Sequence, residues 1–460
     1  MSTRQDAAPS ETIGSRDDLV AWIAAGEKPR ETWSVGTEHE KFVFHGDTRA
    51  PVAHEGKSGI SALMTGFMEC CGWEPIIEDG NIIALKRALG ERGATVSLEP
   101  GGQFELSGAP LRTIHETAAE TQEHLRQCHR AGGPLGLGFL GLGFAPTWTL
   151  NEMPRVPKKR YGIMTRYMPT VGTRGLDMMY RTATIQANLD FGSEADMVTK
   201  LRVALAWQPV ATALFASSPF TEGRPNGFKS MRSEIWRHTD ADRTGMMAFA
   251  FEEGMGYEAF VDYALKVPMY FVYRDGNYID VAGASFKDFM AGKLKGFEGE
   301  RPTLDDWSDH LTTLFPEARL KRFLEMRGAD GGRAEMINAL PALWAGLLYD
   351  ADVLDAAWQR VKDWSAEERQ ALRDQVPRLA LETPFRGGHV ADLAKEMVEL
   401  AARGLAKRQF LDAAGQDERQ YLAPLQEIVD TRQTVADRLL EKYHGAWGGE
   451  INWVFAETAM

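Results

Sequence analysis

The stretch Ser97-Leu-Glu-Pro-Gly-Gly-Gln-Phe-Glu-Leu-Ser107 places two carboxylates and an amide around a pair of glycines. Gln103 and Glu105 are two residues apart, so in a β-strand both side chains point to one face, and the apolar residues that alternate with them point into a core. Pro100-Gly101-Gly102 cannot continue a central strand, and it indicates a bulge or a close backbone approach. We therefore predict strand, kink and strand, with Glu99 just before the kink. The alternative is an ordinary edge strand with a solvated acidic face.

Two other segments, far away in the chain, show the same pattern. Glu38 and Glu40 share one face of a short strand predicted at residues 36–44. Glu325 and Arg327 share one face of a second strand. Clustered carboxylates repel one another unless cations lie between them, and a guanidinium binds phosphate as a fork. If the three strands belong to one sheet, the pattern predicts Mg²⁺ and a nucleotide phosphate on one concave surface. The predicted metal ligands are Glu38, Glu40, Glu99, Glu105 and Glu325.

The composition bounds the class of protein. The 460 residues and 44% hydrophobic content allow a large core, and the net charge of −13 argues against a nucleic-acid partner. The longest apolar run, residues 135–150, is interrupted by glycine and is too short to span a bilayer. The N-terminus lacks the apolar core of a signal peptide, and residues 1–14 are predicted to be disordered. With only three cysteines and no CxxC motif, we expect reduced thiols in a soluble, cytoplasmic protein without a membrane partner.

The chain divides into two regions by pattern. Residues 15–335 are predicted to form the catalytic core, and residues 336–460 a helical region packed on it within one continuous domain. Capping-box patterns at Ser15 and Thr113 begin helices, and Asp275-Gly276 predicts the turn of a β-hairpin. Helices are predicted at residues 15–26, 58–71, 113–130, 193–217 and 303–315.

Polar residues elsewhere suggest further walls of a site. A strand predicted at residues 178–190 has a polar but mostly uncharged face that includes Gln186 and Asn188, which suits hydrogen bonds to a substrate or to metal-bound water. The polar segment 230–245, predicted as a loop, contains Arg232 and Arg243 as candidate anion clamps.

Two groups of basic residues leave alternatives open. Residues 151–177 are predicted to be a basic loop, which is either a solubilising loop or a lid over phosphates or a substrate carboxylate. Lys86, in a short predicted strand, either reaches a phosphate or is a solvated surface charge.

Together these segments strongly resemble the plant and alphaproteobacterial type of glutamate–cysteine ligase. The resemblance covers most of residues 30–350, and the last hundred or so residues match mainly in their helical character. The matching runs include GTEHEKF at 36–42, SLEPGGQFELSGAPL at 97–111, RYMPTVGTRGLDMM at 166–179, QANLDFGSEADM at 186–197 and HLTTLFPEARLKRFLEMRGADGG at 310–332.

The resemblance implies an α+β, glutamine-synthetase-like fold, in which a curved, largely antiparallel β-sheet forms the active-site cavity and helices back it. It also implies the first step of glutathione biosynthesis. ATP, as co-substrate, phosphorylates the γ-carboxylate of L-glutamate, and the amino group of L-cysteine then displaces phosphate to give γ-glutamylcysteine. A monomer or a homodimer is expected, and the disulfide control associated with plant enzymes is in doubt because only Cys70, Cys71 and Cys128 are present.

The residue roles follow from the same resemblance. The five carboxylates named above are expected to hold two or three Mg²⁺ ions, and Arg327 to balance charge on the transferred phosphoryl group. The expected catalytic residues are Arg327, Glu325 and Arg181. The expected substrate- and ATP-binding residues are Gln103, Gln186, Asn188, Arg232, Trp236, Arg243 and Lys86.

Three other functions fit parts of the pattern. A ligase of the same fold could join glutamate to a different amine, because the sequence does not reveal how a thiol is recognised. A non-catalytic glutamate or nucleotide sensor would be favoured by loss of a metal carboxylate, and all five are present. A glycosidase needs only two carboxylates and no arginine beside them.

Overall fold

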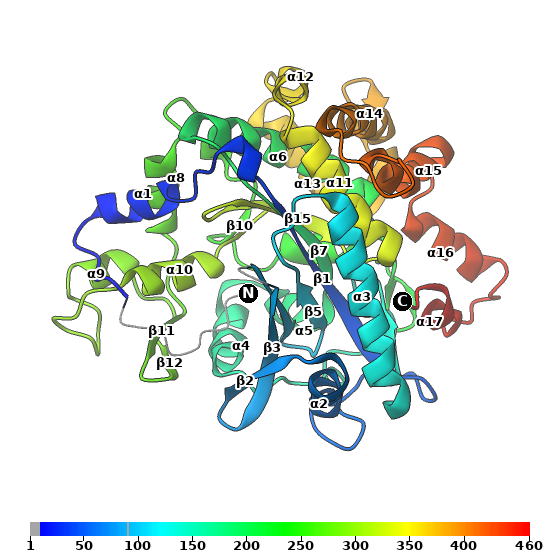
Figure 1. Cartoon of the computed structure of the whole chain (residues 1–460), viewed down its shortest axis with the longest axis horizontal. Helices are drawn as coiled ribbons and strands as arrows, with labels where there is room; N and C mark the ends of the chain where they lie inside the picture. Colours follow the sequence, from blue (N-terminus) through cyan, green and yellow to red (C-terminus); the bar gives the residue numbers. More distant parts are fainter. Residues whose placement is uncertain (1–9, 90–91) are drawn as a thin grey trace.

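The computed structural model of the chain describes residues 10–89 and 92–460. Within these residues, nine strands form one sheet in the order β14-β15-β7-β1-β5-β4-β3-β2, with β6 paired to β1 (Figure 1). The strand pairs of this sheet are antiparallel, as predicted. The strands are β1 (Val35–His45), β2 (Glu74–Glu78), β3 (Asn81–Leu89), β4 (Arg92–Leu98), β5 (Phe104–Ser107), β6 (Leu137–Leu140), β7 (Thr184–Leu189), β14 (Ala318–Leu320) and β15 (Leu324–Asp330).

The three acidic segments do lie in this one sheet. β1 pairs with β5 so that Glu40 is opposite Glu105, and with β7 on its other side. β15 pairs with β7, which places Glu325 opposite Asn188. Because side chains alternate along a strand, this register brings the predicted polar faces to one side of the sheet.

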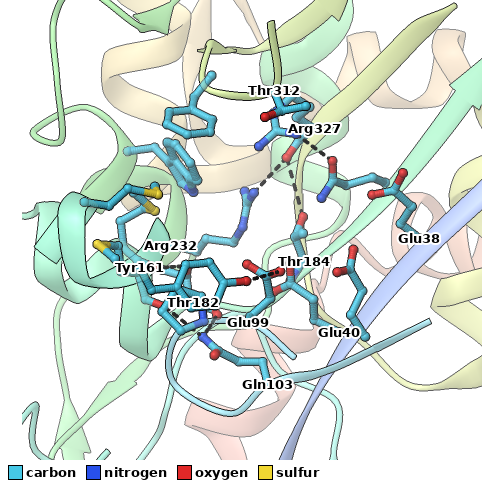
Figure 2. Close-up of a pocket in the computed structure, with 18 of the residues that line it drawn as sticks. Glu38, Glu40, Glu99, Gln103, Tyr161, Thr182, Thr184, Arg232, Thr312 and Arg327 are labelled. Atoms are coloured by element: carbon cyan, nitrogen blue, oxygen red, sulfur yellow. Dashed lines mark hydrogen bonds between the residues drawn. The ribbon is translucent and has the colours of Figure 1, made fainter. Parts of the chain in front are cut away.

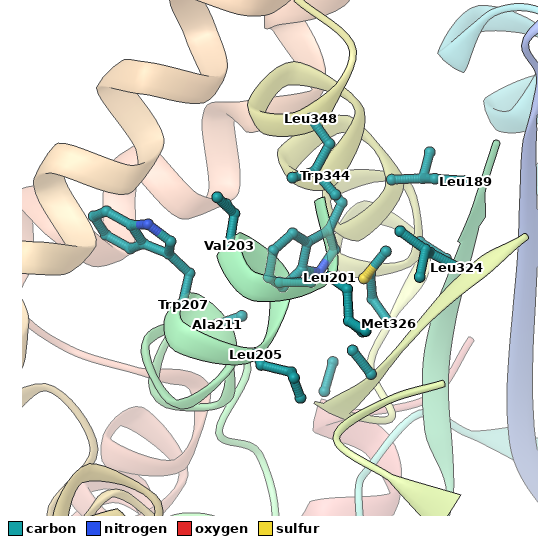
Figure 3. Close-up of a cluster of buried hydrophobic side chains, with 14 of the residues drawn as sticks. Leu189, Leu201, Val203, Leu205, Trp207, Ala211, Leu324, Met326, Trp344 and Leu348 are labelled. Atoms are coloured by element: carbon teal, nitrogen blue, oxygen red, sulfur yellow. The ribbon is translucent and has the colours of Figure 1, made fainter. Parts of the chain in front are cut away.

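The opposite side of the sheet is covered by α6 (Glu194–Leu214) and α11 (Ala334–Leu348). Ser193 caps α6 by accepting a hydrogen bond from the backbone of Asp196, as the sequence pattern predicts. Figure 3 shows the resulting core, in which Leu189 and Leu324 from the sheet face Leu201 of α6 and Trp344 of α11. These side chains are fully buried, so the helices fix the shape of the sheet behind the acidic strands.

A second core lies under the other half of the sheet. α2 (Ile60–Cys71) and α3 (Ile114–Gly132) pack together there, and α3 begins with the predicted capping box at Thr113. Phe104 and Leu106 of β5 are buried in this core, which confirms that they point away from Gln103 and Glu105.

The remaining elements surround the sheet, and the chain after α11 is mostly helical, as predicted. The other helices are α1 (Arg16–Ala24), α4 (Lys159–Val171), α5 (Gly175–Arg181), α7 (Met231–Trp236), α8 (Tyr257–Ala264), α9 (Phe286–Met290), α10 (Leu304–Thr312), α12 (Ala351–Val361), α13 (Ala366–Leu379), α14 (Val390–Arg408), α15 (Ala423–Thr431), α16 (Val435–His444) and α17 (Trp453–Glu457). The short strands are β8 (Phe220–Thr221), β9 (Arg224–Pro225), β10 (Thr244–Gly245), β11 (Phe271–Arg274), β12 (Asn277–Asp280), β13 (Phe315–Pro316), β16 (Pro384–Phe385) and β17 (Gly388–His389), and 3₁₀ turns occupy Arg30–Thr32, Gly133–Leu135, Ala248–Phe251, Ala380–Glu382 and Glu418–Leu422.

Several local predictions were wrong. The basic segment 151–177 is largely helical rather than a loop, because α4 accommodates Pro169 inside its last turn. The strand predicted at 178–190 is shorter, since α5 continues to Arg181, and the segment 230–245 contains the short helix α7. Residues 1–9 lie outside the described residues, but Ile13 is buried and its N–H donates to Pro302, so this part of the predicted disordered N-terminus is packed.

The structure also bears on membranes and thiols. Across the described parts of the chain, none of the helices combines the length and the apolar character that crossing a bilayer requires. Cys70, Cys71 and Cys128 are free thiols.

Candidate active site

One cavity lies on the face of the sheet opposite α6 and α11, where the polar strand faces meet. Figure 2 shows that the carboxylates of Glu38, Glu40 and Glu99 face Arg232 and Arg327 across it. The charged residues of its lining are four carboxylates and four arginines: Glu38, Glu40, Glu99, Glu105, Arg160, Arg232, Arg319 and Arg327.

The acidic wall is buried and crowded. Glu40, Glu99 and Glu105 are all at most 8% exposed. Burial, together with the charge of Glu105, raises the pKa of Glu99 to about 7. Burial and the charges of Glu99 and Glu105 likewise raise the pKa of Glu40 well above its usual range. Without a cation Glu40 and Glu99 therefore retain protons near neutral pH, and a divalent cation would take the place of these protons.

The chemistry of this donor set fits Mg²⁺. Carboxylate oxygens are the ligands that Mg²⁺ prefers, and it usually keeps waters and substrate phosphate oxygens in its coordination shell. In the part of the chain that the structure describes, no group of three or more histidine, cysteine or acidic side chains is arranged so that it could hold a metal ion. An ion at this wall would therefore need further oxygen ligands, such as water, to complete its coordination.

Glu325 lies behind the cavity wall and is held by three cations. Arg319 donates to it twice, from Nε to Oε2 at 3.0 Å and from Nη2 to Oε1 at 2.8 Å. Lys321 lies 3.0 Å from the same carboxylate, and Arg327 pairs with it as well. Although burial opposes ionisation, the charges of these three cations hold the pKa of Glu325 well below its usual range. Glu325 would become a metal ligand only by exchanging one of these partners for the ion.

Arg232 and Arg327 come from two different elements and line the end of the cavity away from the acidic wall. Arg327 of β15 donates from Nη1 to Gln186 Oε1 at 2.8 Å, and Arg232 of α7 donates from Nη2 to the carbonyl of Arg327 at 2.8 Å. Trp236 lies 5.7 Å and 5.9 Å from the two guanidinium carbons, and Phe315 lies on the same side. Nε of Arg232 is buried and has no hydrogen-bond partner among the described residues, so the pair retains capacity for an anionic ligand.

The predicted kink shapes the floor of the cavity. Gly102 has a φ of 74°, and a Cβ at Gly101 would lie 2.2 Å from the carbonyl oxygen of Tyr180. Gln103 fastens the kink, because its Oε1 accepts from the N–H of Gly101 at 2.9 Å and its Nε2 donates to Thr182 O at 2.7 Å. Both ends of this amide are thus engaged within the protein.

α4 forms a side wall of the cavity. It belongs to the basic segment 151–177, for which the sequence left two alternatives, a solubilising loop or a lid. The hydroxyl of Tyr161 donates to Leu98 O at 2.8 Å, and Lys158 reaches the same carbonyl at 3.2 Å. Arg160 lines the cavity and lies 5.0 Å from the ring of Phe271. Three methionines, Met164, Met178 and Met179, also line the cavity.

Besides Glu325, four predicted site residues do not line the cavity. Asn188 donates to Glu38 Oε1 at 2.8 Å and so positions a carboxylate. Lys86 lies 3.7 Å from Glu74 on the outer strands. Arg181 pairs with Asp177 and Glu222, and Arg243 is fully buried against Asp240 at 2.8 Å. Their guanidinium groups meet carboxylates of the protein, so the structure does not support them as clamps for substrate.

Other cavity residues were missed by the sequence analysis. Arg160 belongs to the basic run 151–177, which was noticed but not resolved into individual roles. Arg319 lies opposite Glu325 in the β14–β15 hairpin. The sequence feature that could have identified it is its position six residues before Glu325, across a hairpin turn. Thr182 and Thr184 belong to the polar face predicted for residues 178–190, whereas Tyr161 and Thr312 carried no such signal.

Known proteins resemble the chain along nearly its whole length. It is 52% identical over 453 residues to the chloroplastic glutamate–cysteine ligase of Nicotiana tabacum, covering 98% of this chain and 84% of the relative. It is 52% identical over 443 residues to the chloroplastic enzyme of Arabidopsis thaliana, covering 96% and 82% of the two chains. The crystal structure of a glutamate–cysteine ligase from Francisella tularensis in complex with AMP superposes with a TM-score of 0.52 at 13% identity, covering 93% and 87%. This likeness confirms the glutamine-synthetase-like fold.

The predicted cytoplasmic location was wrong, because the similar ligases are named chloroplastic. That prediction rested on the missing apolar segment and the sparse cysteines, and neither feature distinguishes the cytoplasm from a plastid. The model of glutamate-cysteine ligase family 2 (GCS2) matches residues 34–457. Given this match and the plant relatives, the chain belongs to glutamate–cysteine ligase family 2, plant type.

Proposed function

We propose that the protein catalyses the ATP-dependent ligation of L-glutamate, through its γ-carboxylate, to the amino group of L-cysteine. The single observation that carries this proposal is the pairing of an acidic wall with an arginine wall across one cavity. Phosphoryl transfer to a carboxylate needs both, because the anionic groups must be neutralised and held in line. The family membership and the plant ligases named above support the same reaction.

In the first step, a γ-carboxylate oxygen of glutamate attacks the γ-phosphorus of ATP, and the bond to the β,γ-bridging oxygen breaks to release ADP. Arg232 and Arg327 face the cavity from opposite elements and would balance charge on the moving phosphoryl group. Gln186 fixes the orientation of Arg327, and the buried Glu325 fixes both Arg327 and Arg319. Two or three Mg²⁺ ions, held by Glu38, Glu40, Glu99 and Glu105, would supply further charge neutralisation at the phosphates.

In the second step, the neutral amino group of cysteine attacks the γ-carbonyl carbon. A C–N bond forms, the C–O bond to phosphate breaks, and the nitrogen loses a proton. The three methionines in the lining of the cavity suit the side chain of cysteine, because thioethers pack well against a small, polarisable group. Tyr161, anchored to Leu98, lines the same cavity.

The proposal is tested by measuring ADP release with ATP, Mg²⁺ and L-glutamate, with and without L-cysteine. A parallel assay replaces cysteine with 2-aminobutyrate, which has the amine but no thiol. The proposal predicts strong dependence on cysteine and a γ-glutamyl dipeptide of the expected mass. Turnover only with another amine would indicate a different ligase of this fold, and binding of ATP without turnover would indicate a sensor.

A further inference from the structure

A second cavity, of about 210 Å³, lies beside the end of β15 and shares none of its lining residues with the reaction cavity. Its walls come from the first turn of α11, one face of α16 and the end of α17, which lie near the C-terminus of the chain (Figure 1). The floor is apolar and consists of Phe215, Met336, Val435 and Leu439.

The rim of this cavity is charged. Three cations, Arg333, Arg438 and Lys442, line it together with two carboxylates, Glu335 and Glu457. Arg333 and Glu335 are 3.6 Å apart and about half exposed, so their pairing is weak and easily exchanged. The pairing of Arg438 with Glu427 is similarly exposed on the carboxylate side, which is 60% accessible. Lys442 pairs with Glu457, and both of these side chains are partly exposed.

A cavity with an apolar floor and a few converging polar groups has the usual form of a small-molecule site. Nη2 of Arg438 is buried and has no hydrogen-bond partner among the described residues, so it favours an anionic head, and the floor favours a compact apolar body. We propose that this cavity is a binding site for a small carboxylic acid with an apolar body. The proposal concerns a site apart from the ligase reaction and does not depend on it.

The site is connected to the reaction cavity by hydrogen bonds. Ser217 lines the second cavity, and its Oγ donates to Gly331 O at 2.7 Å while its N–H donates to Asp330 at 2.9 Å. Asp330 also accepts from the hydroxyl of Ser230 at 2.7 Å, and Ser230 is the N-cap of α7, which carries Arg232. An occupant that contacts Ser217 is therefore expected to alter the position of Arg232.

Binding is tested on the full chain with 4-(trifluoromethyl)phenylacetate, followed by ¹⁹F NMR, and with its neutral amide as the charge control. We expect saturable binding of the acid, at least fivefold weaker binding of the amide, and at least a fivefold loss of acid binding in Arg438→Gln and Lys442→Gln. Arg432→Gln, which changes an exposed arginine that does not line the cavity, should bind as the unaltered protein does. Val435→Phe, which fills the floor, should also abolish binding, with thermal unfolding confirming that each variant is folded.

Three results would overturn the proposal: no saturable binding, equal binding of acid and amide, or binding that survives all three cavity variants. Displacement of the probe by ATP, Mg²⁺ and glutamate together would place it in the reaction cavity and would overturn it as well. The connection through Ser217 is tested by the KM for glutamate, which a saturating probe should change at least twofold in the unaltered protein and not in Arg438→Gln. An unchanged KM would contradict that connection.

Discussion

Arg319 and Glu325 face each other across the β14–β15 hairpin and form two parallel hydrogen bonds at 3.0 Å and 2.8 Å, with both side chains buried. Glu325 also meets Lys321 and Arg327, so one carboxylate fixes three cations at the edge of the reaction cavity. Removing a single partner from a buried charge cluster leaves the others uncompensated, which makes this carboxylate a sensitive point of the structure.

Glu325→Gln is expected to lower the free energy of unfolding by about 3–5 kcal/mol, because three buried or half-buried cations lose their anion. Urea unfolding measures this change. The matched control is Glu335→Gln, whose carboxylate is half exposed and 3.6 Å from Arg333, and which should cost about 1 kcal/mol or less. Equal losses in the two variants would contradict the structural role assigned to Glu325.

The acidic wall predicts a dependence of stability on pH and on Mg²⁺. The folded-state pKa of Glu99 is raised to about 7, so its contribution to stability is complete below its usual pKa and is lost as the pH rises through 7. In EDTA, the protein should therefore lose up to about 3 kcal/mol between pH 5 and pH 8 from this group, and Mg²⁺ should restore part of the loss. Urea unfolding at both pH values measures the effect, and Glu99→Gln should reduce it. A metal-free protein whose loss of stability is the same in Glu99→Gln would contradict this account.

Glu40→Gln separates the effect of the acidic wall on stability from its proposed role in binding Mg²⁺. The metal-free variant should be at least as stable as the unaltered protein, since it loses a carboxylate whose pKa is raised by burial and by its neighbours. Its kcat should nevertheless fall by about 100-fold or more, with a higher Mg²⁺ concentration needed for half-maximal rate. Mg²⁺ titrations of the initial rate measure this, and an unchanged Mg²⁺ requirement would exclude Glu40 as a ligand.

The buried lysine Lys41 predicts a pH dependence of stability that is opposite in sign to that of Glu99. Lys41 is fully buried, with Nζ 2.9 Å from His39 Nδ1, and burial lowers its pKa from 10.5 to about 8. Because the charged form is disfavoured in the folded state, stability from this group rises as the pH increases from 8 to 10.5. Lys41→Met should therefore stabilise the protein at pH 7 by about 1–3 kcal/mol and flatten this slope, whereas the exposed Lys57→Met should do neither. A destabilised Lys41→Met variant would indicate that its contacts to His39 outweigh the cost of burial.

The kink between β4 and β5 predicts which glycine cannot be replaced. Gly101→Ala would bring a Cβ to 2.2 Å from Tyr180 O, so α5 must shift and the wall made by Met178 and Met179 must move with it. We expect a loss of roughly 2–4 kcal/mol in unfolding free energy and a raised KM for cysteine. Gly133→Ala, where a Cβ meets no atom within 4 Å, is the control and should be close to neutral. Normal stability and KM in Gly101→Ala would contradict the described packing.

The sequence predicts well which side chains share one face of a strand. It predicts poorly which side chains from distant segments meet in the cavity. Glu38 and Glu40, or Gln103 and Glu105, share a face because alternation in a strand is a local property, and the structure confirms both pairs on the cavity. Arg232 and Arg243 look alike in one polar segment, and only the packing of α7 shows that the first reaches the cavity while the second is enclosed against Asp240. The individual role of Arg160 in the basic run 151–177 could not be predicted for the same reason, since its place depends on how α4 folds over the sheet.

The central claim, that the γ-carboxylate of glutamate attacks ATP in this cavity, is tested most directly by isotope transfer. The protein is supplied with glutamate labelled with ¹⁸O in its γ-carboxylate, together with ATP, Mg²⁺ and cysteine, and the released phosphate is analysed by mass. The account predicts one labelled oxygen in each phosphate released, formed at a rate that falls by about 100-fold or more in Arg327→Lys. Unlabelled phosphate, released while the dipeptide forms, would contradict it.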